Sequence, residues 1–509
     1  MKRLKTIYII ILGIVLSFAS CNEDTIEIDP IGDTEAGFFQ NEDQMTQGVL
    51  GIYQKLSFFY TFRSGNWLSG IWTLPGDNLT TQGDHGYERF ISINGNDGNL
   101  GSFYQYAYQL IARANTMLQK VEENGDIAYT RQPELKNVHR GEALFLRSWM
   151  YFKLWNTYGP AAPLITERIL EMEDAYPHSS QGTGLLDQAI TDLKEAASLL
   201  PDSWDSSNKG RVTKNSAHAL CGKILVFRGT VSNNASDFTD AISEFNAISG
   251  ASLMPSYRDN FDAAQENNAE SFFEYQANEQ SNLTNPFLDN DGFAVVGDIS
   301  AYYGMFTKQP TWIGSNVYSA TQSLLNAYEP GDPRMNYTIN PDEELTNVIK
   351  YTLDGNPVGN WATSYNSNRN NPRILRYADV LLLKAEAIVR SGGNNAEATG
   401  LINQIRERAR LSTDDGSEAS VPADLDINET NSDTILEWIF NERRIELACE
   451  EGHRWYDLRR RHMAGEIDLT QWDFSSARTD IEFTENNLVF PIPTNEIVQN
   501  PNLVQNAGY

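Results

Sequence analysis

The stretch from Ile435 to His462, ILEWIFNERRIELACEEGHRWYDLRRRH, constrains the fold of this chain more than any other. Thr434 and Glu437 have the spacing of a capping box, which predicts that a helix begins there, and Gly452 supplies a left-handed end. At 100° per residue, apolar side chains cover most of the circumference of this helix, so we expect it to be buried. The basic run between Gly452 and His462 predicts a second helical segment.

Two carboxylates, Glu442 and Glu446, fall inside that apolar circumference. Burying a carboxylate alone is costly, so each needs a cation and hydrogen bonds. The nearest cations along the chain follow the glycine: Arg454, Arg459, Arg460 and Arg461. We therefore interpret the segment as a helix hairpin locked by internal Glu–Arg ion pairs. The alternative is a catalytic pair, but such carboxylates flank a glycosidic bond at roughly 5–10 Å, whereas residues four apart project from one helix face.

The same residues resemble a known family. ERRIELACEEGHRWYDLRR at 442–460 is similar to the ER-x-x-EL-x-x-EG-x-R-x-x-DLRR block of the SusD/RagB family, which comprises surface lipoproteins that bind glycans for outer-membrane transporters. Three further blocks agree: RYADVLLLKAEA at 376–387, INQIRERARL at 402–411 and FPIPTNEIVQNPNLVQNAGY at 490–509. The resemblance implies a mainly α-helical, tetratricopeptide-like scaffold with large irregular loop insertions. It also implies a partner, a TonB-dependent barrel transporter of the SusC type.

Residues 1–20 have the pattern of a lipoprotein signal peptide. Three basic residues precede an apolar run, and small residues lead to Cys21. We expect Cys21 to be lipidated and to anchor the chain in the outer membrane; the alternative is ordinary cleavage that leaves a thiol. Residues 21–40 form a polar tether and lead-in. Asn22-Glu23-Asp24 resembles the acidic export signal that sends such lipoproteins to the cell surface.

The charge of the chain narrows the class of ligand. A formal net charge of −29 over 509 residues, without a basic stripe interleaved with aromatics, makes nucleic acid an unsuitable partner. A neutral ligand fits this balance better than a polyanion. Beyond Cys21, only Cys221 and Cys449 remain. Both lie in apolar helical runs, so we expect buried free thiols, although the spacing alone leaves a bridge possible.

The N-terminal part of the chain, 41–250, is expected to be helical. Asn41 and Gln44 cap its first helix, and a long loop rich in Gly, Asn and aromatics is inserted at 62–100. Further helices are predicted at 102–122, 134–158, 185–201 and 213–229. In the third of these, small and apolar residues recur at the offsets of the second helix of a tetratricopeptide repeat, namely Ala189, Leu193, Ala196 and Pro201.

The C-terminal part, 251–509, is expected to have three regions. A loop-rich region covers 251–372 and lacks sustained periodicity. Helices resume over 373–465, the first of them at 373–392. The tail at 488–509 contains three prolines, which oppose a helix, so we expect it to pack as an extended strap.

Local signals for catalysis or for a cofactor are absent from the sequence. It contains no P-loop, HExxH, GxSxG or CxxC pattern, and its six histidines lack metal-ligand spacing. The run Asp289–Gly292 resembles a calcium loop, but Phe287 occupies the upstream ligand position. We therefore expect no catalytic residue, metal or cofactor. Two function classes remain, a glycan-binding lipoprotein and a surface-anchored glycoside hydrolase, and we favour the first.

A sugar ring has an apolar face and a polar rim, so its binder presents flat aromatic rings beside amides and carboxylates. Both irregular regions qualify, because loops can present aromatics that helices commit to packing. Our first choices are Trp72 and Trp312, each beside Pro and Gly. The other candidates are Trp67, Asn78 and Tyr87 in the first region, and Tyr302, Tyr303 and Trp361 in the second. The alternative for each is that it fills the core.

Overall fold

The computed structural model of the chain describes residues 35, 37–60, 68–81, 86–277, 318–340, 346, 348–351, 370–474 and 480–509. The predicted signal peptide and Cys21 lie outside these residues, as does the run Asp289–Gly292. Within the described part, none of the helices is both long enough and apolar enough to cross a bilayer.

The described chain is mainly helical, as predicted, with two small antiparallel sheets. The α-helices are α2 Glu42–Gln54, α3 Ser57–Tyr60, α4 Gly70–Thr73, α5 Gly86–Arg89, α6 Gly98–Ala128, α7 Glu134–Tyr158, α8 Gly184–Leu199, α9 Lys214–Ser232, α10 Ala235–Ala247, α12 Gln322–Ala327, α13 Pro333–Thr338, α14 Tyr377–Arg390, α15 Asn395–Arg410, α16 Ser432–Glu446, α17 His453–Met463 and α18 Thr494–Gln499. The strands are β1 Leu79–Thr81, β2 Ser271–Glu274, β3 Tyr318–Ala320 and β4 Arg373–Arg376.

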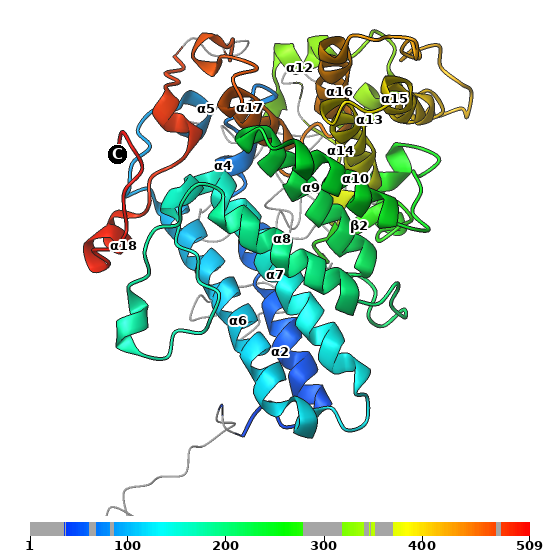
Figure 1. Cartoon of the computed structure of the whole chain (residues 1–509). Helices are drawn as coiled ribbons and strands as arrows, with labels where there is room; N and C mark the ends of the chain where they lie inside the picture. The colour runs from blue at the N-terminus through cyan, green and yellow to red at the C-terminus, as the bar shows by residue number, and fades with distance from the viewer. Residues whose placement is uncertain are drawn as a thin grey trace, which may run out of the picture.

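The longest helices, α6 and α7, run beside α2 in the lower part of the molecule (Figure 1). Asn41 caps α2 as predicted: its side chain accepts a hydrogen bond from the backbone N–H of Gln44, and the Gln44 side chain accepts one from the amide of Asn41. The first of these bonds satisfies a backbone N–H that a helix start otherwise leaves unpaired, and the second holds the two side chains together. The chain therefore enters its helical body at a well-defined point.

From α7 onward, neighbouring helices pack in succession, α7 on α8, α8 on α9, α9 on α10, α10 on α14 and α14 on α15 and α16. Small residues allow the close approach. Ala189 and Ala196 of α8 are fully buried, and a Cβ on Gly222 of α9 would lie 2.3 Å from the ring of Phe245 in α10. One large apolar cluster extends from Met45 to Leu503.

The strands join segments that are far apart in the sequence. Leu79 of β1 pairs with Ala320 of β3, and Ser271 of β2 pairs with Arg376 of β4. None of the four strands in the described part was predicted from the sequence, because each has only three or four residues and is too short to show alternation. The second pairing also explains why the predicted helix at 373–392 begins later, at Tyr377: its first four residues are β4.

Two further expectations need correction. The loop predicted at 62–100 contains α4, β1 and α5, which are too short to give a periodic signal. The tail is extended over much of its length but includes α18, because Pro493 precedes the helix and Pro501 follows it, so neither proline interrupts its hydrogen bonds. The expectation for Cys221 and Cys449 is confirmed, since both thiols are buried and unbridged.

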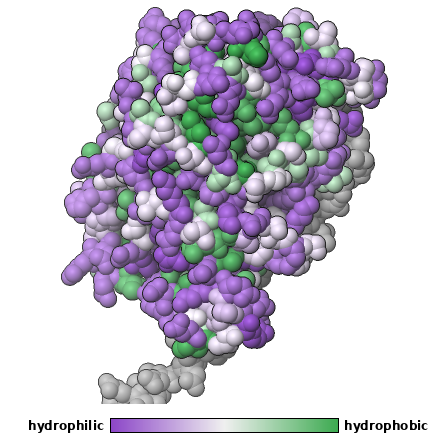
Figure 2. Space-filling model, turned by 45° about the vertical axis from the view of Figure 1, so that its right-hand side comes forward, coloured by the Kyte–Doolittle hydropathy of each residue, from purple (hydrophilic) through white to green (hydrophobic). Residues whose placement is uncertain are grey.

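One face of the molecule is mostly hydrophilic, consistent with the strong acidic charge of the chain (Figure 2). Hydrophobic side chains gather toward the centre of this face. In Figure 1, α2 begins at the bottom of the molecule, whereas α12 and α16 lie together at the top. Features of α12 and α16 are therefore far from the point where the chain enters the fold.

Candidate functional site

The predicted hairpin is present and consists of α16 and α17. Its first helix is capped by Asn431, whose side chain accepts a hydrogen bond from the N–H of Thr434, so the helix begins slightly earlier than the capping-box spacing predicted. Gly452 has a φ of 89°, and a Cβ there would lie 2.4 Å from the carbonyl oxygen of Trp72. This position needs glycine for its backbone conformation and for space.

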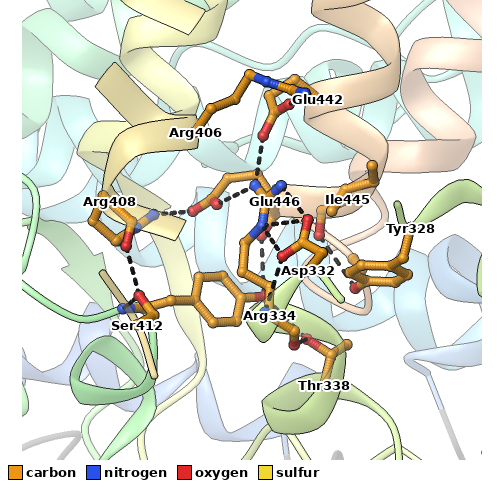
Figure 3. Close-up of polar contacts among 12 residues, drawn as sticks. Tyr328, Asp332, Arg334, Thr338, Arg406, Arg408, Ser412, Glu442, Ile445 and Glu446 are labelled. Atoms are coloured by element: carbon orange, nitrogen blue, oxygen red, sulfur yellow. Dashed lines mark hydrogen bonds and ion pairs between the residues drawn. The ribbon is translucent and has the colours of Figure 1, made fainter. Parts of the chain in front are cut away.

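Glu442 and Glu446 are buried, as predicted, and both are paired with arginines (Figure 3). Glu446 accepts from Arg376 at 2.7 Å, from Arg334 at 3.1 Å and from Arg408. Glu442 accepts from Arg406 at 2.9 Å and from Arg334. These arginines come from α13, β4 and α15, so the hairpin carboxylates tie three other elements together.

The surrounding ion pairs extend this arrangement into what we call the buried charge cluster. Its members are Asp332, Glu270, Glu442, Glu446 and Glu450 with Arg334, Arg376, Arg406, Arg408 and Lys350. Five acidic groups face five basic groups, so the cluster is formally neutral. Each side chain is at most 9 % exposed.

The charges in the cluster are fixed by their neighbours. Burial raises the pKa of Glu446, but Arg408, Arg376 and Arg334 outweigh it and hold the pKa far below the ordinary value. Burial lowers the pKa of Arg334, yet Glu442 and Asp332 outweigh it and raise the pKa well above the ordinary value. Glu446 therefore stays ionised at neutral pH, and it is sealed from solvent. A general acid must hold a proton near neutral pH and reach a substrate, so this carboxylate is structural.

The predicted partners of these carboxylates are wrong. Arg454 instead pairs with Asp77, Nε to Oδ1 at 2.6 Å. Arg459 donates to the carbonyl oxygens of Leu488 and Trp155, and burial lowers its pKa to about 10. Both side chains point from α17 toward the N-terminal part and the tail, away from the inner face of α16. Nearness along the chain therefore did not predict which charges meet.

A signal for the true partners was present in the sequence. Arg376, Arg406 and Arg408 belong to the blocks at 376–387 and 402–411 that carried the family resemblance. Linking those blocks to Glu442 and Glu446 through their charges would have found three of the partners. Arg334 lies in the loop-rich region, where no motif marks it.

Three of the predicted sugar-contacting residues lie in the core, and for them the prediction is wrong. Trp72 is 1 % exposed, with Lys153 Nζ 3.8 Å from its ring centroid. Asn78 is 4 % exposed and accepts a hydrogen bond from Arg444 Nε at 2.8 Å, and Tyr87 is 3 % exposed. Trp72 and Asn78 are covered by helices that are distant in sequence, which the local composition cannot reveal. The remaining candidates lie outside the described residues: Trp67, Tyr302, Tyr303, Trp312 and Trp361.

An open cavity lies beside the buried charge cluster, between α12 and α16. Its volume is about 640 Å³, within the range of roughly 300–1,000 Å³ that is common for ligand sites. Trp438 and Asn441 of α16 line one side, and Gln322 and Asn326 of α12 line the other. We call it the α12–α16 cavity. It combines an aromatic ring, several amides and room for a ligand.

Two family models match the chain. The SusD family model matches residues 228–509, and a model described as "Starch-binding associating with outer membrane" matches residues 78–226. Among curated proteins, SusD-like protein P2 of Formosa agariphila is 25% identical over the full length of both chains. A SusD-like protein of Bacteroides ovatus is 24% identical over 89% of this chain and 82% of its own.

Solved structures agree on the fold. A SusD homolog from Bacteroides thetaiotaomicron has a TM-score of 0.74 at 20% identity, covering 94% of this chain and 99% of its own. A structure named "Laminarin binding SusD-like protein" has a TM-score of 0.68 at 25% identity, covering 92% of this chain and 100% of its own. The overlap with these structures spans both halves of the chain.

Proposed function

Because this chain belongs to the SusD family, we propose that it is a cell-surface lipoprotein that binds oligo- or polysaccharides and delivers them to a SusC-like, TonB-dependent transporter in the outer membrane. The observation that carries this proposal is the similarity over nearly the whole chain to a SusD-like protein that binds laminarin. The mostly hydrophilic face in Figure 2 and the net charge of −29 support a neutral ligand such as a glycan.

Binding is tested on the secreted chain without its signal peptide. We expect it to bind one or more polysaccharides on an array that includes laminarin and soluble starch, with affinity then measured by calorimetry. Reducing-sugar release from the same polysaccharides should stay at the level of a buffer control. Turnover would instead support the surface-anchored glycoside hydrolase, and binding to no polysaccharide on the array would overturn the proposal.

Several aromatic residues outside the described part remain candidates for ligand contact. Trp67, Tyr303, Trp312 and Trp361 lie in the two irregular regions of the sequence. Replacing a ring that stacks on a sugar should cost on the order of 1–3 kcal/mol of binding free energy. For Trp312→Ala, calorimetry with the bound polysaccharide gives this value directly. An unchanged affinity would remove Trp312 from the site.

The membrane anchor depends on Cys21. The described helices offer no membrane span, and acyl chains supply stable attachment when more than one is present. We expect Cys21→Ala to give a folded protein that no longer sediments with outer membranes. A variant that stays with the membranes after a high-salt wash would contradict lipid anchoring.

The transporter partner is tested in the native membrane. We expect affinity purification of the full lipoprotein from detergent-solubilised outer membranes to recover a TonB-dependent barrel in a stable complex. Recovery of the lipoprotein without any such barrel, under conditions that preserve other membrane complexes, would contradict delivery to a SusC-like partner.

A further inference from the structure

The α12–α16 cavity is built by four segments of the chain. Its described walls come from α12 with the following Glu329, from α16, from α15 with the following Leu425, and from Asp473 after α17. Trp438, Asn441, Glu442 and Ile445 occupy positions i, i+3, i+4 and i+7 of α16, so one face of a single helix supplies the aromatic, amide, acidic and apolar groups together.

Trp438 differs from the other partly exposed tryptophans among the described residues. The guanidinium of Arg211 lies over the Trp204 ring, 4.0 Å from its centroid, and that of Arg454 lies 5.7 Å from the centroid of Trp472. Within the same part of the chain, no cation stacks on Trp438, which is partly exposed and borders the cavity. Its ring therefore offers an apolar surface to a ligand.

Amide side chains line both sides of the α12–α16 cavity. Gln322 Nε2 donates to Asn326 Oδ1 at 2.8 Å, which holds these two exposed side chains together on α12. Across the cavity, the exposed amide of Asn441 makes no hydrogen bond to any described residue. Amides both donate and accept, as sugar hydroxyls do, so these side chains can satisfy several hydroxyls at once.

Two arginines, Arg406 and Arg444, line the floor of the α12–α16 cavity, and both are already paired within the protein. Arg406 donates to Glu442 at 2.9 Å, to the carbonyl of Ala423 at 2.6 Å and to Glu329. Arg444 donates to Asn78 at 2.8 Å and to Ser323 at 2.7 Å. Binding a sulfate or carboxylate here would require breaking these pairs beside the acidic groups Glu329, Glu442 and Asp473. The floor therefore disfavours anionic sugars.

From these contacts we propose that the α12–α16 cavity is a binding site for a neutral oligosaccharide, with Trp438 stacking on a sugar ring and the amides of Gln322, Asn326 and Asn441 bonding its hydroxyls. The proposal rests on the glycan-binding function proposed above. The shared residues Glu442 and Arg406 join the cavity floor to the buried charge cluster, so the site is held rigid before the ligand arrives.

The test measures calorimetric affinity of the secreted chain for laminarin, soluble starch, alginate and a sulfated galactan. We expect binding to a neutral polysaccharide and none to the two anionic ones. Trp438→Ala should then weaken binding by about 10- to 100-fold, and Trp438→Phe, which keeps an aromatic face, by less. The matched control is Trp204→Ala, another partly exposed tryptophan beside a cavity of about 290 Å³, which should leave affinity unchanged.

Trp438 also packs on the smaller apolar cluster between α14, α15 and α16, so its alanine variant is checked by thermal unfolding. The double variant Gln322→Ala/Asn441→Ala alters only exposed side chains and should weaken binding at least threefold without lowering the melting temperature. If both the double variant and Trp438→Phe bind the polysaccharide with unchanged affinity, the α12–α16 cavity is not the binding site, although the chain still binds glycans. Binding only to the anionic polysaccharides overturns the neutral specificity, and a chain that binds none of the four overturns the inference together with the neutral-glycan function.

Discussion

The buried charge cluster and the α12–α16 cavity share Glu442 and Arg406 but differ in how their polar groups are satisfied. In the cluster, Glu446 meets three arginines and is sealed from solvent. In the cavity, Asn441 and Gln322 are exposed. Groups that are fully paired within the protein contribute to its stability, whereas groups left open to solvent are available to a ligand. The same helix, α16, thus supports the fold through Glu446, and its residues Trp438 and Asn441 line the cavity that we propose as a binding site.

The largest expected effect is on the cluster side. Glu446→Ala leaves Arg334, Arg376 and Arg408 without their shared carboxylate, so we expect the free energy of unfolding to fall by about 3–5 kcal/mol. Urea denaturation of the wild type and variant measures this. A loss below about 0.5 kcal/mol, the range of an ordinary surface substitution, would show that Glu446 contributes little to the stability of the fold.

A second buried carboxylate is that of Glu386 in α14. It pairs with Arg460 of α17 and with Arg390 of its own helix. Burial raises the pKa of Glu386, but these arginines outweigh it and lower the pKa from 4.5 to about 2. Because the folded pKa is depressed, the ionised group stabilises the fold above pH 4.5, and this contribution is lost as the pH falls toward 2.

Comparison of the wild type with Glu386→Gln tests this linkage. We expect the difference in unfolding free energy between them to narrow by about 3 kcal/mol between pH 5 and pH 2, measured by urea denaturation at several pH values. A difference that stays constant with pH would mean that Glu386 titrates normally in the folded state.

The turn that joins the two helices of the hairpin gives a smaller effect. Gly452→Ala combines a left-handed backbone with a contact to the Trp72 carbonyl oxygen, so we expect a loss of about 2–3 kcal/mol. Gly392 has a φ of 71°, but a Cβ at this position would have nothing within 4 Å, so Gly392→Ala should cost only about 1 kcal/mol. Equal losses of unfolding free energy in Gly452→Ala and Gly392→Ala would show that the backbone at Trp72 moves aside at little energetic cost.

The smallest effect on stability is expected on the cavity side. Asn441→Ala removes an exposed amide that bonds to no described residue, so the free energy of unfolding should change by less than about 0.5 kcal/mol. Calorimetry with the bound neutral polysaccharide should nevertheless show weaker binding. A variant that loses stability but keeps its affinity would show that Asn441 supports the fold and does not contact the ligand.

Much of the fold was predictable from the sequence because helices carry a local periodic signal. The bounds of α7 match the predicted 134–158. The end of the first hairpin helix was predicted less well, because α16 stops at Glu446, and Gly452, in the expected left-handed conformation, precedes α17. The burial of Glu442 and Glu446 also followed from the apolar residues around them. The short strands did not, because pairing between residues such as Leu79 and Ala320 depends on segments that are distant in the chain.

The candidate site was less predictable. Trp72 was chosen because its neighbours include Pro and Gly, yet α7 places Lys153 against its ring. Trp438 was not among the predicted sugar-contacting residues, although it borders the α12–α16 cavity. Periodicity assigns a residue to a face, but whether that face is fully covered depends on the elements that pack against it.

The sequence by itself determined that this chain forms a mainly helical fold of the SusD family, with the carboxylates of Glu442 and Glu446 buried in its most constrained helix. Only the tertiary structure decided which cations meet them: Arg334 and Glu442 are 108 residues apart in the chain. The physical reason is that helix propensity and burial depend on neighbours within a few turns, whereas ion pairing and ligand access depend on distances that exist only after the chain has packed.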